Sequence, residues 1–286
     1  MRRAALLPLL LTLAACGETG PGGAGTAGGI GLPSPGAQPA LNDTGVTVFI
    51  SDANDGTAPL AHPTAPTGWP NQDAASGRDA RANDDTDGRA GFRFTKLDER
   101  GAPLPADATE WHCVLDEITG LVWEVKTDDP NDPRYGGHTF SWYDPDPATN
   151  GGHPGKPDEG SCNGEVTGLS CDTAAYVRYV NGIGLCGFSD WRLPTVPELL
   201  SLVDYGAPTA HLIDPAFFPN TFASDHWSSQ TAVGRACTDY TDPARPEYPG
   251  GMAWEVHFDL GHAETHCKWD NRGTGQVAIY VRLVRG

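Results

Sequence analysis

The stretch Asp190-Trp191-Arg192-Leu193-Pro194-Thr195 leads directly into a predicted helix and carries the strongest local signal in the chain. Thr195 and Glu198 have the spacing of a capping box, and Pro197 suits the first turn of a helix. We therefore interpret Asp190 and Arg192 as braces of the turn into this helix, with Trp191 and Leu193 in the core. The alternative is that Arg192 contacts a ligand.

The segments around this motif predict an α+β domain. Asp172 suits the N-cap of a second helix over residues 173–182. Two apolar runs, at 112–115 and 121–125, flank a turn that ends in Gly120 and predict a β-hairpin. Because further strands are expected at 46–50, 92–94, 227–229, 252–258 and 277–284, the pattern indicates a mainly antiparallel sheet with two helices and long loops.

Composition and charge exclude several classes of protein. The 286 residues carry 19 Lys+Arg against 37 Asp+Glu, a formal net charge of −18. Because nucleic-acid binding requires clustered basic residues to contact phosphates, we expect no nucleic-acid partner. Ser228 lies near His226, but no tight-turn signature marks it as a nucleophile. We therefore do not expect an enzyme.

The N-terminus has the pattern of an export signal. Met1-Arg2-Arg3 precedes an apolar run that is too short to span a bilayer and that ends in Leu13-Ala14-Ala15-Cys16. This ending resembles a bacterial lipobox, which implies that residues 1–15 are removed and that acylated Cys16 anchors the protein in a lipid bilayer. Gly17 then suggests sorting to the outer membrane. An ordinary secretory signal is the alternative.

Three further segments follow the predicted signal peptide. Residues 16–40 form a Gly- and Pro-rich tether that has too few bulky side chains to form a core. Residues 41–105 are expected to form an irregular module packed on the main domain, which covers residues 106–286. The excess of Gly and Pro is thus divided between the tether and the long loops of the main domain.

The six cysteines that follow Cys16 are even in number and predict three disulfides in an exported chain. They allow fifteen pairings, among which the sequence alone does not choose. We favour Cys162–Cys171, which closes the loop before the first helix, Cys113–Cys186, which ties the hairpin to the helices, and Cys237–Cys267, which closes the late loops.

Two groups of residues are candidates for metal binding. Asn83, Asp85 and Asp87 match the first half of an EF-hand calcium loop, but Phe94 occupies the position where that loop requires a glutamate. These three residues therefore suggest Ca²⁺ as a cofactor. The alternative interpretation is an Asp-rich turn that binds only solvent. His257, His262 and His266, with Asp259 and Glu264, have a spacing that supplies a zinc site if the loop folds back. We instead expect exposed residues of a hairpin loop.

Several motifs, in this order, resemble the Lcl C-terminal domain family, which is named for a bacterial collagen-like adhesin. The motifs are Thr119-Gly120-Leu121-Val122-Trp123-Glu124, Thr139-Phe140-Ser141-Trp142-Tyr143, Cys171-Asp172-Thr173, the run Cys186 to Thr195, His226-Trp227-Ser228-Ser229, Ala253-Trp254-Glu255-Val256 and Tyr280-Val281-Arg282-Leu283-Val284-Arg285. The resemblance covers residues 106–286 and implies a C-type-lectin-like fold outside the cytoplasm.

The expected function is therefore recognition or adhesion by a domain tethered to the cell envelope, with a glycan or a protein as ligand. An envelope enzyme that acts on glycans and a purely structural envelope component are the alternatives. The namesake adhesin binds sulfated polysaccharides. Because this chain is strongly acidic, we do not expect it to bind the same polyanions.

Overall fold

The computed structural model describes residues 42–51, 60–62, 71–81, 85–234, 236–238, 247–269 and 279–286. The predicted signal peptide, Cys16 and the tether at 16–40 lie outside the described residues. The chain divides into two units, Met1–Leu32 and Pro33–Gly286, and every element below belongs to the second. Among the residues described, no helix has the length and apolar character needed to cross a membrane.

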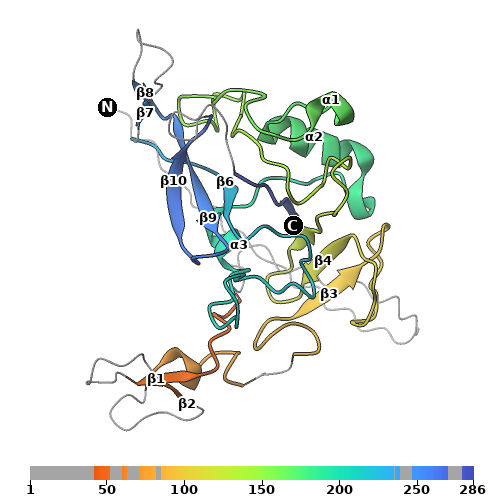
Figure 1. Ribbon diagram of the computed structural model, residues 1–286, viewed down its shortest axis with the longest axis vertical. Coiled ribbons are helices and arrows are strands. Elements are labelled where there is room, and N and C mark those ends of the chain that lie inside the picture. Colours follow the sequence, from red (N-terminus) through yellow and green to blue (C-terminus); the bar gives the residue numbers. More distant parts are fainter. Residues whose placement is uncertain are drawn as a thin grey trace, which may run out of the picture. The chain divides into compact units, whose positions relative to one another are not determined.

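Short antiparallel strands form the framework of the domain (Figure 1). The predicted hairpin is confirmed as β4 and β5, the central strands of a four-stranded sheet. Its order is β11 (Val284–Arg285), β5 (Val122–Glu124), β4 (Cys113–Asp116) and β3 (Phe94–Leu97). A three-stranded sheet has the order β10 (Ala263–Cys267), β9 (Met252–His257) and β6 (Asp225–Thr231). Two small pairs are β1 (Phe49–Ser51) with β2 (Leu60–His62) and β7 (Ala236–Thr238) with β8 (Glu247–Pro249).

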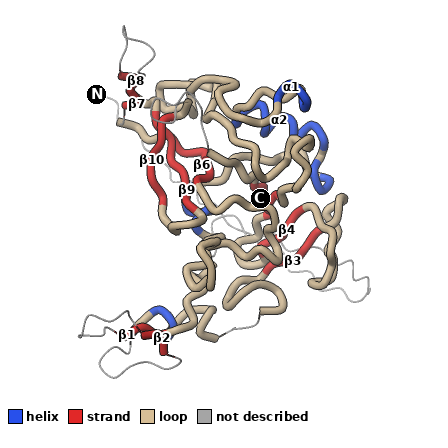
Figure 2. The backbone as a smooth tube through the Cα atoms, in the orientation of Figure 1, coloured by secondary structure: helices blue, strands red, loops and turns tan. Residues whose placement is uncertain are grey.

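Both predicted helices are present, and their caps are those expected from the sequence. Helix α2 (Thr173–Ile183) starts at Asp172, whose side chain accepts a hydrogen bond from the Ala175 N–H. Helix α3 (Val196–Leu200) starts at Thr195 with a complete capping box. The single turn α1 (Gly164–Thr167) and the 3-10 turns η1 (Asp73–Ala75) and η2 (Leu185–Gly187) are additional. The helices are short, and most of the described chain is loop (Figure 2). The α+β class with mainly antiparallel strands is therefore confirmed.

The prediction of a strand over 277–284 is wrong for residues 279–283, which form only one isolated bridge, at Tyr280. This segment instead connects the two sheets. Trp227 N–H donates to the Tyr280 carbonyl (3.0 Å), and Glu124 N–H donates to the Leu283 carbonyl (3.1 Å). Residues 281–284 are all buried, so the segment has no solvent face. Its apolar pattern thus reflects burial on every side rather than pairing within one sheet.

Two apolar cores lie on opposite faces of β5, because neighbouring strand residues point to opposite sides. Val122 belongs to the first core and Trp123 to the second. The first core also holds three buried tryptophans and residues of α2, among them Trp142, Trp191, Trp227, Ala175 and Val180. The second holds Phe92, Phe94, Leu199, Phe217, Phe218 and Val256. The large aromatic residues that cluster in the sequence therefore supply the bulk of both cores.

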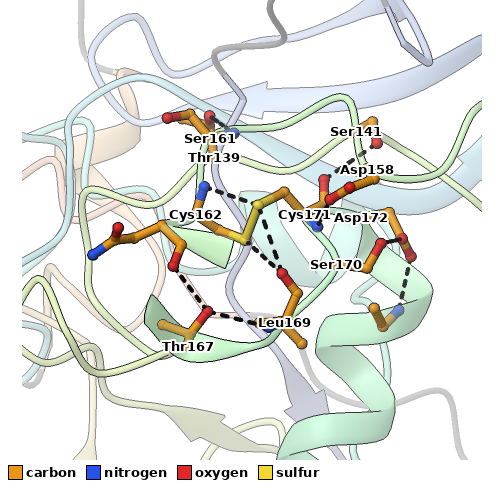
Figure 3. The surroundings of a disulfide bond; sticks show 12 residues. Thr139, Ser141, Asp158, Ser161, Cys162, Thr167, Leu169, Ser170, Cys171 and Asp172 are labelled. Atoms are coloured by element: carbon orange, nitrogen blue, oxygen red, sulfur yellow. Dashed lines mark hydrogen bonds between the residues drawn. A yellow bond between two sulfur atoms is a disulfide. The ribbon is translucent and has the colours of Figure 1, made fainter. Parts of the chain in front are cut away.

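Three disulfides hold the loops, and they are the three pairs favoured from the sequence. Cys113–Cys186 spans 73 residues and Cys237–Cys267 spans 30. Figure 3 shows Cys162–Cys171, which spans 9 residues and stands beside the start of α2. There Asp172 accepts hydrogen bonds from Ala175 N–H (2.8 Å) and from the Ser170 hydroxyl (2.6 Å). The bridge and the cap therefore fix the same helix end.

The described part of residues 41–105 contacts the main domain at several points. Strand β3 forms an edge of the four-stranded sheet, and Phe94 packs in the second core. Arg89 forms a bidentate ion pair with the buried Asp204, and its guanidinium also donates to the Gly45 carbonyl (2.7 Å). These contacts connect the N-terminal segment to the loop that follows α3.

Candidate functional site

The motif at 190–195 braces the turn into α3. The Arg192 guanidinium forms two hydrogen bonds with the Glu198 carboxylate, at 2.9 and 2.7 Å. Burial by itself would raise the pKa of Glu198, but Arg192 and Thr195 together hold that pKa below its usual value. A hydrogen bond from Arg285 lowers the pKa of the Asp190 carboxyl. Each charged member of the motif is therefore paired within the protein.

The apolar members of the motif are anchored from α2 and from strand β6. Trp191 is buried, and its indole N–H donates to the Leu185 carbonyl (3.1 Å). The Asn181 side chain accepts a hydrogen bond from Trp191 N–H (2.7 Å). The Pro194 carbonyl accepts from Ser229 N–H (2.7 Å). Leu193, which was expected in the core, is only partly buried against it, and Asp190, Arg192 and Thr195 also reach the surface.

A pocket of about 290 Å³ lies where this surface meets α2 and the segment 142–144. The lining is mainly apolar, with an exposed arginine and an aspartate. Its residues are Trp142, Tyr143, Asp144, Thr173, Ala174, Val177, Arg178, Arg192, Leu193 and Ser229. An apolar lining with a few polar groups is typical of a binding site for a small molecule or for part of a larger one.

The walls of this pocket are fixed by hydrogen bonds. Tyr143 and Thr173 form a reciprocal pair, in which Tyr143 N–H donates to the Thr173 hydroxyl and that hydroxyl donates to the Tyr143 carbonyl (2.9 and 3.0 Å). Asp144 accepts a hydrogen bond from the Thr149 hydroxyl (2.6 Å). Within the described part of the chain, the exposed Arg178 of α2 makes no ion pair, whereas Arg192 is paired with Glu198. The pocket is therefore preorganised, with Arg178 placed to contact a ligand.

A larger pocket of about 500 Å³ lies near the end of α2. Its lining is mostly polar and includes two arginines and two acidic residues: Arg100, Arg134, Glu99 and Asp132. It contains none of the residues that the sequence marks as candidates for binding. We therefore take the smaller pocket beside the motif as the candidate binding site.

Two of the expected calcium residues, Asp85 and Asp87, lie in a turn before β3. Asn83 lies outside the described residues. The Asp85 carboxylate accepts a hydrogen bond from Ala90 N–H (2.9 Å), and the Asp87 carboxylate faces the Arg93 guanidinium (3.4 Å). Phe94 is buried at the position of the missing glutamate. The carboxylates of Asp85 and Asp87 thus each contact a hydrogen-bond donor from the protein itself.

The Ser228 hydroxyl is buried and donates to the Trp254 carbonyl (2.7 Å). His226 is also buried, and its Nδ1 lies 2.9 Å from the Ser224 carbonyl. Burial lowers the pKa of His226 to about 3. These two residues are therefore part of the packing, and the hydroxyl of Ser228 does not point to solvent as a nucleophile would.

A buried ionic network, which the sequence patterns do not predict, connects β5 with α2 and with residues 282–283. The Glu124 carboxylate accepts hydrogen bonds from Lys126 Nζ (3.1 Å), from the Tyr176 hydroxyl and from Leu283 N–H (3.0 Å). The Arg282 guanidinium donates to the Glu124 carbonyl. Burial lowers the pKa of Lys126 to about 8, although Glu124 opposes the shift. Because side chains alternate between the two faces of β5, Glu124 shares a face with the buried Val122. This alternation is the sequence signal that would have predicted the burial of Glu124.

The late histidines separate into two places. His257 and His262 stack ring on ring, with centroids 4.6 Å apart, and Glu264 lies beside both. His266 is buried elsewhere, near Trp227. The expectation of exposed loop residues is wrong for His257, whose side chain is 12 % exposed and belongs to β9, and for His266, which is buried in β10. The sequence grouping missed Asp225 and Glu255, which strand pairing brings to the same place.

These observations define a disulfide-bonded α+β domain with a preorganised surface pocket. The family model of the Lcl C-terminal domain matches residues 112–285, and the chain belongs to this family. The resemblance found in the sequence motifs is thereby confirmed at the level of the family. Neither a curated protein nor a solved structure matches the chain.

Proposed function

We propose that the protein is a lipid-anchored component of the cell envelope whose domain, residues 106–286, has a C-type-lectin-like fold and binds a glycan or protein ligand. Membership of the Lcl C-terminal domain family supports a binding or adhesin-like role. The observation that carries the proposal is the pocket between α2 and the 190–195 motif. Its apolar floor and its charged rim suit the ring faces and the polar groups of a sugar or a peptide.

The arrangement of charges favours a role for Arg178 in recognition. Arg192 is engaged with Glu198, whereas Arg178 projects from the exposed side of α2. Val177 and Leu193 supply apolar surface beside it. An arginine next to apolar surface combines directed hydrogen bonds with contact area, a combination that is enriched at binding hot spots.

A binding screen tests this proposal. The full-length chain is applied to an array of neutral and anionic glycans and to surface-immobilised envelope proteins, with wild type compared with Arg178→Ala. Arg81→Ala is the matched control, because Arg81 is also an exposed arginine but lies outside the pocket. We expect at least a tenfold weaker affinity for Arg178→Ala and no change for the control. Equal binding by all three proteins, or no binding to any probe, would contradict the proposed site.

The anchor is tested separately by fractionation. Replacement Cys16→Ser removes the sulfur that the lipid would modify, so we expect the protein to move from the membrane pellet to the soluble fraction. Mass spectrometry of the wild-type N-terminal peptide should show the added mass of the acyl chains. Membrane association that persists in Cys16→Ser would overturn the lipid anchor but not the binding site.

A further inference from the structure

The β10–β9–β6 sheet (Figure 1) carries, at one end, a cluster of histidine and carboxylate side chains. His257 ends β9, and two carboxylates approach its Nε2 atom. Glu264 Oε1 lies 3.2 Å and Glu255 Oε1 3.7 Å from that nitrogen. The Nε2 atom of His262 lies 4.0 Å from the other oxygen of Glu264. Two imidazole nitrogens and two carboxylates therefore converge on a small volume.

These separations match those among the ligands of one metal ion. Ligand atoms placed 2.0–2.1 Å from a tetrahedral Zn²⁺ are about 3.3 Å apart. The distance between His257 Nε2 and Glu264 Oε1 has this value within 0.1 Å, and the other two distances need only small side-chain rotations. Since His262 and Glu264 are each nearly half exposed, such rotations are open to them.

The second ring nitrogen of His257 provides an independent indication. Its Nδ1 lies 2.7 Å from Asp225 Oδ1, across the β6–β9 pair. Histidines that bind metals through one nitrogen usually donate the other N–H to a carboxylate, which fixes the ring and its tautomer. Asp225 therefore holds the imidazole so that Nε2 faces Glu264 and Glu255.

The strand register adds an electrostatic argument. Glu255 and Glu264 are directly opposite each other in the β9–β10 pair, and Glu255 is fully buried. Like charges at such positions destabilise a sheet. Asp225 and Asp259 bring the number of carboxylates within 3.7 Å of the His257 ring to four. A divalent cation bound between Glu255 and Glu264 would place an attractive charge between these two facing carboxylates.

The donor set also selects the kind of cation. Calcium and magnesium prefer sites built from oxygen atoms alone. Imidazole nitrogen combined with carboxylate oxygen suits zinc and its neighbours among the transition metals. Cysteine takes no part, because the six cysteines of the domain are all in disulfides.

We propose that the β9–β10 hairpin binds one Zn²⁺ ion through His257, His262 and Glu264, with Glu255 as the fourth protein ligand and Asp225 as the positioning residue of His257. The ion would join both strands of the hairpin and, through Asp225, strand β6. This site is distinct from the ligand pocket, with which it shares no residue.

The experiment is a titration of the full-length chain, purified without a histidine tag and stripped with a chelator. Zn²⁺, Ca²⁺ and Mg²⁺ are titrated separately by calorimetry. We expect one Zn²⁺ per chain, no comparable binding of Ca²⁺ or Mg²⁺, and a higher melting temperature with Zn²⁺. Absence of stoichiometric zinc binding, or tighter binding of calcium, would overturn the proposal.

Variants locate the site. His262→Gln removes a half-exposed ligand, so we expect the metal-free variant to melt as the wild type does while stoichiometric zinc binding is lost. His211→Gln is the matched control, because His211 is an exposed loop histidine outside the cluster. Asp225→Asn should weaken zinc binding about 10- to 100-fold, the usual cost of losing such a carboxylate. Retention of zinc binding by His262→Gln, or an equal loss in His211→Gln, would refute this assignment.

Discussion

Replacement Glu124→Ala tests how much the buried ionic network contributes to the stability of the fold. The Glu124 carboxylate is fully buried and accepts hydrogen bonds from Lys126, Tyr176 and Leu283 N–H. Its removal leaves the Lys126 ammonium in the core without a counter-charge. It also leaves the Leu283 N–H, on the segment that connects the sheets, without its carboxylate acceptor.

The magnitude follows from the cost of a lone buried charge. Removing one partner of a buried ion pair usually costs about 3–5 kcal/mol. Lys126 avoids a higher cost by losing its proton. At pH 7 deprotonating a lysine costs about 1.4 kcal/mol for each of the roughly 3.5 pH units below its ordinary pKa, or about 5 kcal/mol. We therefore expect the free energy of unfolding at pH 7 to fall by about 3–5 kcal/mol.

The same reasoning predicts how the loss depends on pH. In the wild type burial lowers the pKa of Lys126 to about 8, so at pH 7 the lysine is charged in both the folded and the unfolded chain. In Glu124→Ala the folded lysine is already neutral at pH 7, whereas the unfolded one is protonated. The unfolded variant then binds one proton more, and the stability of the variant rises with pH. Because the wild-type lysine also begins to lose its proton near pH 8, the deficit should shrink by about 1 kcal/mol between pH 7 and 8 and by less than about 0.5 kcal/mol above that.

The assay is urea unfolding with the disulfides intact, followed by tryptophan fluorescence at pH 7.0, 8.0 and 9.0. Glu99→Ala is the control, because Glu99 is also paired with a cation, Arg100 at 3.6 Å, but is 71 % exposed. Exposed pairs contribute at most about 1 kcal/mol. A Glu124→Ala protein no less stable than the Glu99→Ala protein, or a deficit independent of pH between 7 and 8, would refute the reasoning.

Three further predictions concern acid stability, a disulfide and the helix cap. Because burial lowers the pKa of His226 to about 3, the unfolded chain takes up a proton first as the pH falls. His226 should thus leave the free energy of unfolding unchanged above pH 6.5 and lower it by about 1.4 kcal/mol per pH unit between pH 6.5 and 3. His226→Asn should remove this slope when unfolding is measured across the acid range. Cys113→Ser combined with Cys186→Ser opens a 73-residue span and should cost about 4 kcal/mol in urea unfolding, and a loss under 1 kcal/mol would contradict the entropic argument. Arg192→Lys keeps the charge but loses the bidentate contact with Glu198, so thermal unfolding should show a loss of about 0.5–1 kcal/mol, whereas no loss would argue against the brace.

The sequence predicts those elements whose signals are local. Asp172 and Thr195 mark their helices because a cap satisfies backbone N–H groups within three residues. The hairpin of β4 and β5 follows from two apolar runs around a turn that ends in Gly120. The pairing of Arg192 with Glu198 also has a local cause, because the first turn of α3 places Glu198 near Arg192.

The long-range strand pairings and the burial of charged side chains were decided by the tertiary structure alone. The segment 279–283 has the composition of a strand, but it connects two sheets, and all of its residues except the partly exposed Tyr280 are buried. In the sequence, Glu124 is an ordinary acidic residue near the end of an apolar run. It becomes part of a buried network because the fold places Lys126, Tyr176 and Leu283 within hydrogen-bond distance of its carboxylate.

The two candidate sites illustrate the same division. The sequence by itself determined the family, the two capped helices and the residues of the motif, because these depend on the order of neighbouring residues. The tertiary structure decided that α2, residues 142–144 and the motif enclose a pocket. It also decided that Asp225 and Glu255 face His257 whereas His266 does not, because the register between strands, rather than spacing along the chain, determines which side chains meet across a sheet.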